Sequence, residues 1–168
     1  MKKVTITFLI ILSMTFVTSA QNGLNIGGSI GFPINSSSYD FTFGYTLDAN
    51  YLFEVHSSFS LGVASGYGQG FGDTYRGPLG VEIDVADYQY VPVALIGRHY
   101  PNSKLVWGTD IGYAIAVSDV DRGGFYFRPM IGFNVTDKLQ LNANYVGISD
   151  YYYWSTLNLG ITLNISKN

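Results

Sequence analysis

The sequence contains no cysteine, few charged residues and no excess of basic ones. Of its 168 residues 12% are charged, and the formal net charge is −3. Without cysteine the chain forms no disulfide scaffold, no thiolate zinc site and no cysteine nucleophile. Without a basic surface a nucleic-acid partner is not expected. The low charge also separates the chain from ordinary soluble enzymes, in which about a quarter of the residues are charged.

Glycine and aromatic residues are abundant instead. The chain has 20 Gly, 14 Tyr, 11 Phe and 2 Trp, and 47% of it is hydrophobic. Disordered chains have the opposite composition, with many charges and few aromatic residues. The length is that of one domain of ordinary size.

The first twenty residues have the features of a secretory signal peptide. Lys2 and Lys3 precede a mostly apolar run over residues 4–17, and small residues lead to Ala20. The alternative, a transmembrane helix, needs about 20 apolar residues, and this run is shorter and interrupted by Thr and Ser. We therefore expect a signal peptide over residues 1–20 and a mature domain over residues 21–168, which is 148 residues long. Loss of the two lysines moves the formal charge from −3 to −5.

The remaining sequence alternates between bulky apolar and small polar residues, as β-strands with two different faces do. In the last such segment the odd positions are aliphatic, from Leu157 to Ile165, whereas the even positions include Asn158, Thr162 and Asn164. Eight segments are predicted as strands, at residues 24–32, 41–54, 59–68, 88–100, 105–115, 125–135, 139–145 and 157–165. The segment at residues 88–100 alternates least clearly, because it contains Pro92 and a run of apolar residues.

The composition of the two faces decides which kind of barrel the strands form. A soluble lipocalin-like barrel turns its bulky apolar side chains inward. Here a narrow lumen has room for the Gly, Ala, Ser, Thr and Asn face, so the bulky face must contact lipid. The predicted fold is all-β, an eight-stranded antiparallel up-and-down transmembrane β-barrel, and we expect a monomer.

The lengths of the connections support this topology independently. Both termini of such a barrel lie on the periplasmic side, so odd-numbered connections form the longer outer loops. The odd connections span residues 34–40, 71–87, 118–124 and 149–155, and the even ones span residues 56–58, 101–104 and 136–138. Long and short connections alternate as expected.

Two segments add to this pattern, Tyr90-Val91-Pro92-Val93 and Trp107-Gly108-Thr109-Asp110-Ile111-Gly112-Tyr113. With them, the chain resembles the small outer-membrane β-barrel domain proteins of Gram-negative bacteria, which include PorT-like members. The resemblance implies an outer-membrane location, contact with outer-membrane lipid and lipopolysaccharide, and handling by the barrel-assembly machinery. An unidentified protein partner is also expected. The chain departs from the pattern at its end, where many such barrels have an aromatic residue and this one has Asn168.

A few charged residues share the inward face of the predicted strands, and charges inside a narrow barrel should pair. This predicted lumen charge cluster consists of Asp48, Glu54, Arg98, Asp110 and Arg128. Counting from the short turns predicts two layers, with Glu54 beside Arg98 and Arg128 beside one or both aspartates. The cluster is interpreted as a structural plug, and an ion path is the alternative.

Aromatic residues near the strand ends are predicted to form two girdles at the membrane interfaces. The outer girdle comprises Tyr39, Tyr88, Phe125, Tyr151, Tyr152, Tyr153 and Trp154. The inner girdle comprises Phe53, Phe59, Trp107 and Phe133.

The outer loops are acidic, which indicates a solvated rim or loose contact with divalent cations that bridge to lipopolysaccharide. Their acidic residues are Asp40, Asp73, Glu82, Asp84, Asp87, Asp119, Asp121 and Asp150, against Arg76 and Arg122. No specific metal site, cofactor or nucleotide loop is expected, because the Gly-rich run at residues 66–72 lacks the Lys-Ser/Thr of a phosphate-binding loop. The alternate glycines of residues 62–72 are instead expected to make room for larger side chains.

The function expected from these observations is structural or interaction-based: envelope integrity, surface contact or an accessory subunit. A narrow, porin-like channel for small polar solutes or ions is the alternative. An outer-leaflet lipid-modifying enzyme is a second alternative, but no catalytic residues are identified for it. The only histidines, His56 and His99, lie at the periplasmic ends of the predicted strands, away from the outer loops. We therefore expect no enzymatic activity.

Overall fold

The computed structural model describes residues 23–34, 41–76, 82–117, 123–149 and 154–166. The predicted signal peptide at residues 1–20 lies outside them. Within this part of the chain, no helix is long and apolar enough to cross a membrane.

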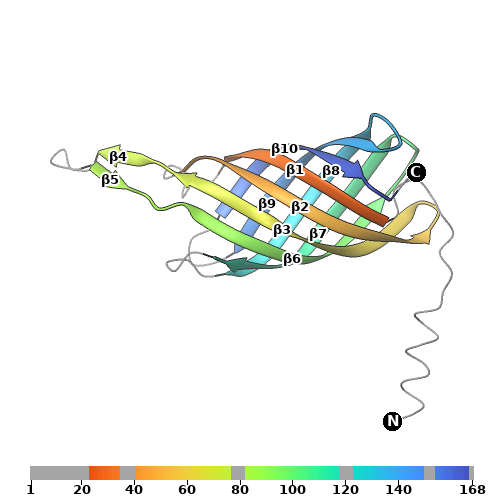
Figure 1. The fold of residues 1–168 in the computed structure, drawn as a ribbon, viewed down its shortest axis with the longest axis horizontal. Helices are drawn as coiled ribbons and strands as arrows, with labels where there is room; N and C mark the ends of the chain where they lie inside the picture. The colour runs from red at the N-terminus through yellow and green to blue at the C-terminus, as the bar shows by residue number, and fades with distance from the viewer. Residues whose placement is uncertain (1–22, 35–40, 77–81, 118–122, 150–153, 167–168) are drawn as a thin grey trace, which may run out of the picture.

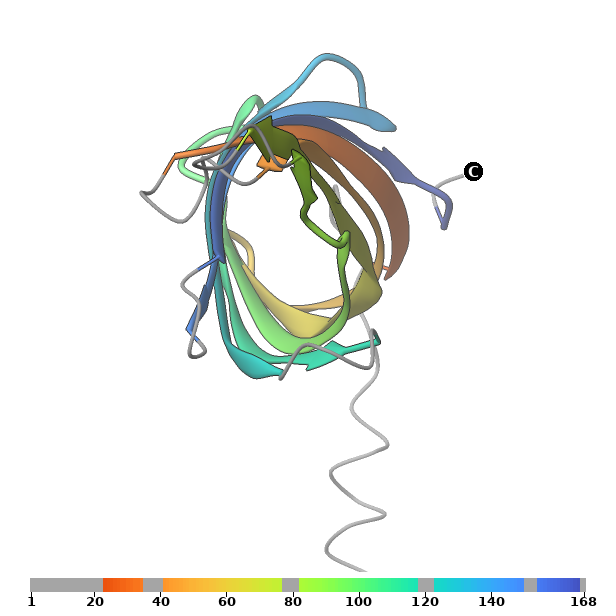
Figure 2. The same ribbon diagram turned by 90° about the vertical axis from the view of Figure 1, so that its left-hand side faces the viewer.

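Eight antiparallel strands close into a barrel, as the sequence predicts (Figures 1 and 2). Around the barrel the order is β1-β10-β9-β8-β7-β6-β3-β2. The strands are β1 (Gly23–Pro33), β2 (Phe41–His56), β3 (Phe59–Gly72), β6 (Tyr88–His99), β7 (Leu105–Ala116), β8 (Gly124–Asn134), β9 (Leu139–Ser149) and β10 (Trp154–Asn164). Each barrel strand pairs with the next barrel strand along the chain, so the topology is up-and-down. Between β3 and β6 the chain forms a separate short hairpin that is not part of the barrel.

The first and last strands close the ring. Asn25 lies opposite Asn164 and Phe32 lies opposite Leu157 in the β1–β10 ladder. At the end of this ladder the backbone N–H of Ile165 donates to the carbonyl of Leu24 at 2.9 Å. Closure matters because it leaves no strand edge of the barrel open to lipid, where unpaired backbone groups are costly.

The connection between β3 and β6, which is predicted from the sequence to be a loop, contains two further strands. These are β4 (Thr74–Arg76) and β5 (Glu82–Asp84), which form a two-stranded hairpin of their own. The hairpin extends well beyond the barrel at one end, which we call the long-loop end; β1 begins and β10 finishes at the other, the short-turn end (Figure 1). The last long connection is shorter than its predicted span of residues 149–155, because β9 ends at Ser149 and β10 already begins at Trp154. The alternation of long and short connections is therefore weaker there than predicted.

Alternation of side chains along the strands produces the predicted inverted pattern. In β10, Leu157, Leu159 and Ile161 are exposed on the outer face, whereas Asn158 and Asn164 are buried in the lumen. A shift of one residue would exchange these two sets, so the pattern fixes the register.

One predicted position is wrong because the strand is irregular there. Phe41 has the parity of the outer face, but a β-bulge between Phe41 and Phe43 changes the alternation. Phe41 is half-buried and packs its ring edge-on against Trp154, with the ring centroids 4.8 Å apart.

Candidate functional site

Two arginines and two aspartates meet in the middle of the lumen. β7 and β8 place Asp110 directly opposite Arg128 in their ladder. Arg128 Nε donates to Asp110 Oδ2 at 2.7 Å, and Arg128 Nη2 lies 2.6 Å from the same oxygen. Arg98 Nη1, from β6, lies 2.6 Å from Asp110 Oδ1. Asp110 is therefore held by both guanidinium groups and is 1% exposed.

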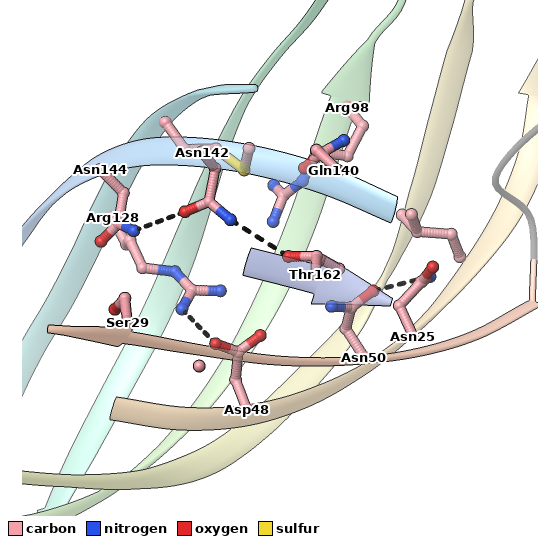
Figure 3. Close-up of a pocket in the computed structure, with 13 residues that line it drawn as sticks. Asn25, Ser29, Asp48, Asn50, Arg98, Arg128, Gln140, Asn142, Asn144 and Thr162 are labelled. Atoms are coloured by element: carbon pink, nitrogen blue, oxygen red, sulfur yellow. Dashed lines mark hydrogen bonds and ion pairs between the residues drawn. The ribbon is translucent and has the colours of Figure 1, made fainter. Parts of the chain in front are cut away.

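Arg128 also reaches across the lumen to the other side of the barrel. Its Nη1 donates to Asp48 Oδ1, on β2, at 3.0 Å (Figure 3). The two positive and two negative charges balance within the cluster. A buried charge left alone costs several kcal/mol, so this arrangement depends on all four side chains being present.

The structure places four of the five predicted cluster residues together, but not in two separate layers. Arg98 joins Asp110, which connects the expected lower layer to the upper one. Glu54 also has the expected inward position on β2 and is half-buried. The predicted contact of Arg128 with one or both aspartates is confirmed with both. The two layers are joined, because the long Arg98 side chain extends over Gly108 to Asp110.

Amide and hydroxyl side chains fill the lumen around the charge cluster. Asn164 donates to Asn25, and Asn25 donates to Asn50, at 3.0 and 3.1 Å. On the adjacent strands β9 and β10, Asn144 donates to Asn142, which donates to Thr162 (Figure 3). The cavity that these side chains line with the two arginines offers about 20 Å³ to the centres of water molecules. That is space for about one water, so the lumen at this level does not hold a continuous column of solvent.

The lumen toward the long-loop end is closed by aromatic and aliphatic side chains, which sequence reasoning missed. Tyr88 and Tyr90 of β6 stack against each other, and Tyr88 also packs on Trp154 with centroids 5.4 Å apart. This group, which we call the aromatic layer, comprises Tyr88, Tyr90, Tyr126, Val146, Ile148 and Trp154, all buried.

Two residues of the predicted outer girdle, Tyr88 and Trp154, belong to the aromatic layer instead. Tyr88 and Trp154 face the lumen rather than lipid, because both have the even parity of the inward residues of their strands. Phe125 is 52% exposed on the outer face, as a girdle residue should be. Tyr39, Tyr151, Tyr152 and Tyr153 lie outside the described residues.

Two glycines of β3 make room for the aromatic layer. A Cβ atom at Gly68 would collide with the Tyr90 ring, and one at Gly70 would collide with the Trp154 ring. Trp154 comes from β10, which is not adjacent to β3 in the barrel. Gly68 and Gly70 of the Gly-rich run therefore accommodate large side chains, as expected from their inward parity.

The four residues of the predicted inner girdle lie on the outer face near the short-turn end. Phe53, Trp107 and Phe133 are exposed, and Phe59 is half-buried. Phe59 lies opposite His99 and Phe133 lies opposite Leu105, so both are close to short turns.

A second outward aromatic group near the long-loop end was not singled out from the sequence. Tyr45 and Tyr67 both donate their hydroxyls to Gln69 Oε1, at 3.1 and 3.2 Å. Gln69 in turn donates to Asp87, whose second oxygen accepts the backbone N–H of Gly72. The group combines rings on the apolar face with polar tips near the loops, as aromatic belts do. It also ties the base of the β4–β5 hairpin to the barrel wall.

The acidic rim is described only in part. Asp73, Glu82 and Asp84 are exposed on or beside the hairpin, and Thr74 donates to Asp84 at 2.7 Å. Asp40, Asp119, Asp121, Arg122 and Asp150 lie outside the described residues, as does the side chain of Arg76. Within the described part of the chain, no group of three or more His, Asp or Glu is placed to hold a metal ion.

Comparisons with known proteins identify the fold. No protein-family model and no curated protein matches the sequence. Among solved structures, the de novo designed barrel TMB2.3 matches with a TM-score of 0.58 at 12% identity, over 90% of this chain and 100% of the design. The outer membrane protein Ail of Yersinia pestis matches with a TM-score of 0.55 at 15% identity, over 83% of this chain and 97% of Ail. Neisserial surface protein A matches with a TM-score of 0.50 at 13% identity, over 88% and 100%.

At these identities the likeness is one of fold. It supports the outer-membrane-barrel part of the resemblance found in the sequence, whereas the PorT-like part stays an expectation. The chain is an all-β protein, a closed eight-stranded antiparallel barrel similar to known outer-membrane β-barrels.

Proposed function

We propose that the protein is a monomeric outer-membrane barrel that acts as a closed structural or interaction element and not as a channel. The observation that carries this proposal is the filled lumen. The charge cluster crosses the barrel from Asp110 to Asp48, and the cavity beside it admits about one water molecule. The aromatic layer closes the lumen a second time toward the long-loop end.

The location is supported by the outer surface of the barrel. Its exposed side chains are large and apolar on every barrel strand, with Ile30, Leu95 and Leu159 between 59% and 73% exposed. Soluble monomers rarely expose contiguous apolar patches beyond a few hundred Å², so this surface needs lipid around it. The sequence of residues 1–20 supports export through a cleaved signal peptide, and the fold supports insertion by the barrel-assembly machinery.

Surface contact is the role that the long-loop end favours. The β4–β5 hairpin stands away from the barrel (Figure 1) and exposes Asp73, Glu82 and Asp84. Its negative charge suits a partner with basic groups or divalent cations that bridge it to lipopolysaccharide. Ail and Neisserial surface protein A, which share the fold, are named as an outer membrane protein and a surface protein. We propose no enzymatic activity, because in the described part of the chain both histidines, His56 and His99, are exposed at the short-turn end, outside the closed lumen.

Planar bilayer recording of the purified protein tests the closed lumen. We expect no steady conductance from the natural sequence or from Leu159→Ala, a control change on the outer face. A steady ohmic conductance from the natural sequence would overturn the proposal and favour the narrow channel.

The placement in the membrane can be tested through the lack of cysteine, because any introduced cysteine is unique. We expect Asp84→Cys, on the hairpin, to react with a membrane-impermeant maleimide in intact cells. Asp137→Cys, in the short turn between β8 and β9, should react only after the cells are opened. The reverse pattern would show the opposite orientation, and equal labelling in intact cells would refute membrane insertion.

A further inference from the structure

Successive rows of inward residues cross the lumen wall from β10 over β1 to β2, and in two of them a side chain of β1 makes the link. In the first row Asn164 donates to Asn25 and Asn25 donates to Asn50. These three residues lie opposite one another in the ladders. Two rows further along the same face Ser29 of β1 bonds Thr46 of β2 at 2.7 Å. A polar side chain in the central position thus joins its row.

The row between these two has a glycine in its central position. Gly27 lies opposite Thr162 of β10 and Asp48 of β2. A Cβ atom at Gly27 would lie 3.2 Å from both Thr162 Oγ1 and Asp48 Oδ2. Within the described part of the chain, Thr162 bonds Asn142 and Asp48 bonds Arg128, but they do not bond each other. A small polar group above Gly27 is therefore close to hydrogen-bond reach of both oxygens.

Two chains of hydrogen bonds end beside this place with a donor. Asn50 accepts from Asn25 with Oδ1, so its Nδ2 points the other way, into the lumen cavity. Asn50 is 7% exposed, and this nitrogen has no acceptor among the described residues. Thr162 accepts from Asn142, which leaves its hydroxyl proton to be donated elsewhere. Figure 3 shows these two groups and the carboxylate of Asp48 around one space.

The size and the charges of the cavity identify the ligand. The cavity offers about 20 Å³ to the centres of water molecules, which is space for about one. A cation there would lie beside the guanidinium groups of Arg98 and Arg128, and an anion would lie beside the carboxylate of Asp48. A water molecule is neutral and has both donors and acceptors, so it can accept from Asn50 and Thr162 and donate to Asp48.

We propose that one structural water is bound in the lumen above Gly27, where it accepts from Asn50 Nδ2 and the Thr162 hydroxyl and donates to Asp48 Oδ2. The inference rests on the closed lumen proposed above and names the ligand that completes its hydrogen bonds. The water does for this row what the Asn25 amide does for the neighbouring one, and it joins the last strand of the barrel to β2. Because packed side chains surround the cavity, this water should exchange slowly with bulk solvent.

The test combines a crystal structure with NMR spectra of the protein in detergent micelles. The crystal structure should show one peak of water density within about 3.2 Å of Asp48 Oδ2, Asn50 Nδ2 and Thr162 Oγ1. In nuclear Overhauser spectra a long-lived water gives cross-peaks to the protons beside it. We expect such a cross-peak to the side-chain amide of Asn50.

Three variants show which side chains hold the water. Thr162→Val keeps the size of the side chain but removes the hydroxyl, so the cross-peak should weaken about fivefold or more, since the water loses one of its hydrogen bonds. Thr162→Ser keeps the hydroxyl and should retain the cross-peak. Thr46→Val is the matched control, because it removes a lumen hydroxyl that bonds Ser29 directly, and it should leave the cross-peak unchanged. Migration in SDS gels with and without heating shows that each variant is folded.

The outcomes separate this site from the closed lumen. A direct hydrogen bond between Asn50 and Asp48, with no water density beside them, would overturn the water site and leave the closed lumen standing. Anomalous density at this place after a bromide soak would identify an anion and overturn the site as well, as would an unchanged cross-peak in Thr162→Val. A continuous row of water peaks through the lumen, together with conductance in planar bilayers, would contradict the closed lumen itself.

Discussion

The half of the lumen nearest the short turns is filled mostly by groups that pair charges and hydrogen-bond, whereas the half nearest the long connections is filled mostly by packed rings and aliphatic groups. Asp110 has two cationic partners in the first half, and Trp154 has Phe41 and Tyr88 in the second. In the polar half the loss of one partner leaves another group buried and unpaired. In the aromatic half a change acts mainly through volume. The same closed barrel therefore has two kinds of sensitivity to mutation.

The largest effect is expected at Asp110. Asp110→Asn removes the charge that two buried arginines share, and breaking a buried ion pair costs about 3–5 kcal/mol. The free energy of unfolding in urea, measured in lipid vesicles, checks this value. Asp137→Asn, in an exposed turn, is the control and should change stability by less than about 1 kcal/mol. A small effect at Asp110 would show that the cluster does not hold the polar half together.

A somewhat smaller effect is expected from removing the largest ring of the aromatic layer. Trp154→Ala leaves a cavity among Phe41, Tyr88 and the β3 glycines, and such truncations cost about 3 kcal/mol or more. Phe125→Ala on the outer face leaves its space to lipid and should cost clearly less. Equal losses in the two variants would contradict the inward position of Trp154.

Adding volume to the aromatic layer should also destabilise it. In Gly70→Ala the new methyl group meets the Trp154 ring, and overpacking of this kind costs about 1–3 kcal/mol. A second change, Trp154→Phe, should relieve most of that cost, which a double-mutant cycle of unfolding free energies would measure. Gly97→Ala is the control, because its methyl group makes ordinary contact. If the two changes are additive, the glycine and the ring do not touch.

The smallest effect is expected outside the lumen. Tyr45→Phe removes one hydroxyl that donates to Gln69, and such a bond contributes about 0.5–1.5 kcal/mol. Tyr113→Phe, also on the outer face, is the matched control. An effect as large as that of Asp110→Asn would mean that the wall, and not the lumen, determines stability.

Most of the fold could be predicted because one physical rule acts on every strand. Leu157, Leu159 and Ile161 alternate with small or polar residues, and only one barrel orientation puts them in contact with lipid. The β4–β5 hairpin could not be predicted in this way, because three-residue strands are too short to show an alternation. The bulge that turns Phe41 inward likewise has no signal in the pattern of apolar residues.

The contact of Arg128 with both aspartates could be predicted, but the joining of the two expected layers through Arg98 could not. Asp110 and Arg128 share the inward parity of two strands joined by one loop, so their meeting follows from topology. Tyr88 and Trp154 were assigned to the lipid interface from residue type, although both continue the inward parity of their strands. The signal was therefore present at these positions. The reach of Arg98 over Gly108 depends on side-chain length and could not be found from parity.

The closure between β1 and β10 also bears on chain connectivity. The backbone N–H of Leu24 donates to the Ser166 hydroxyl at 2.7 Å, so the two ends of the barrel sequence lie side by side. A ring of antiparallel strands has no structural beginning, and chains with adjacent termini tolerate circular permutation. A permuted chain that joins residue 166 to residue 23 through a short linker, and begins at Glu82 and ends at Arg76, would keep every ladder of the barrel. Its new termini would then lie at the end of the barrel opposite residues 23 and 166.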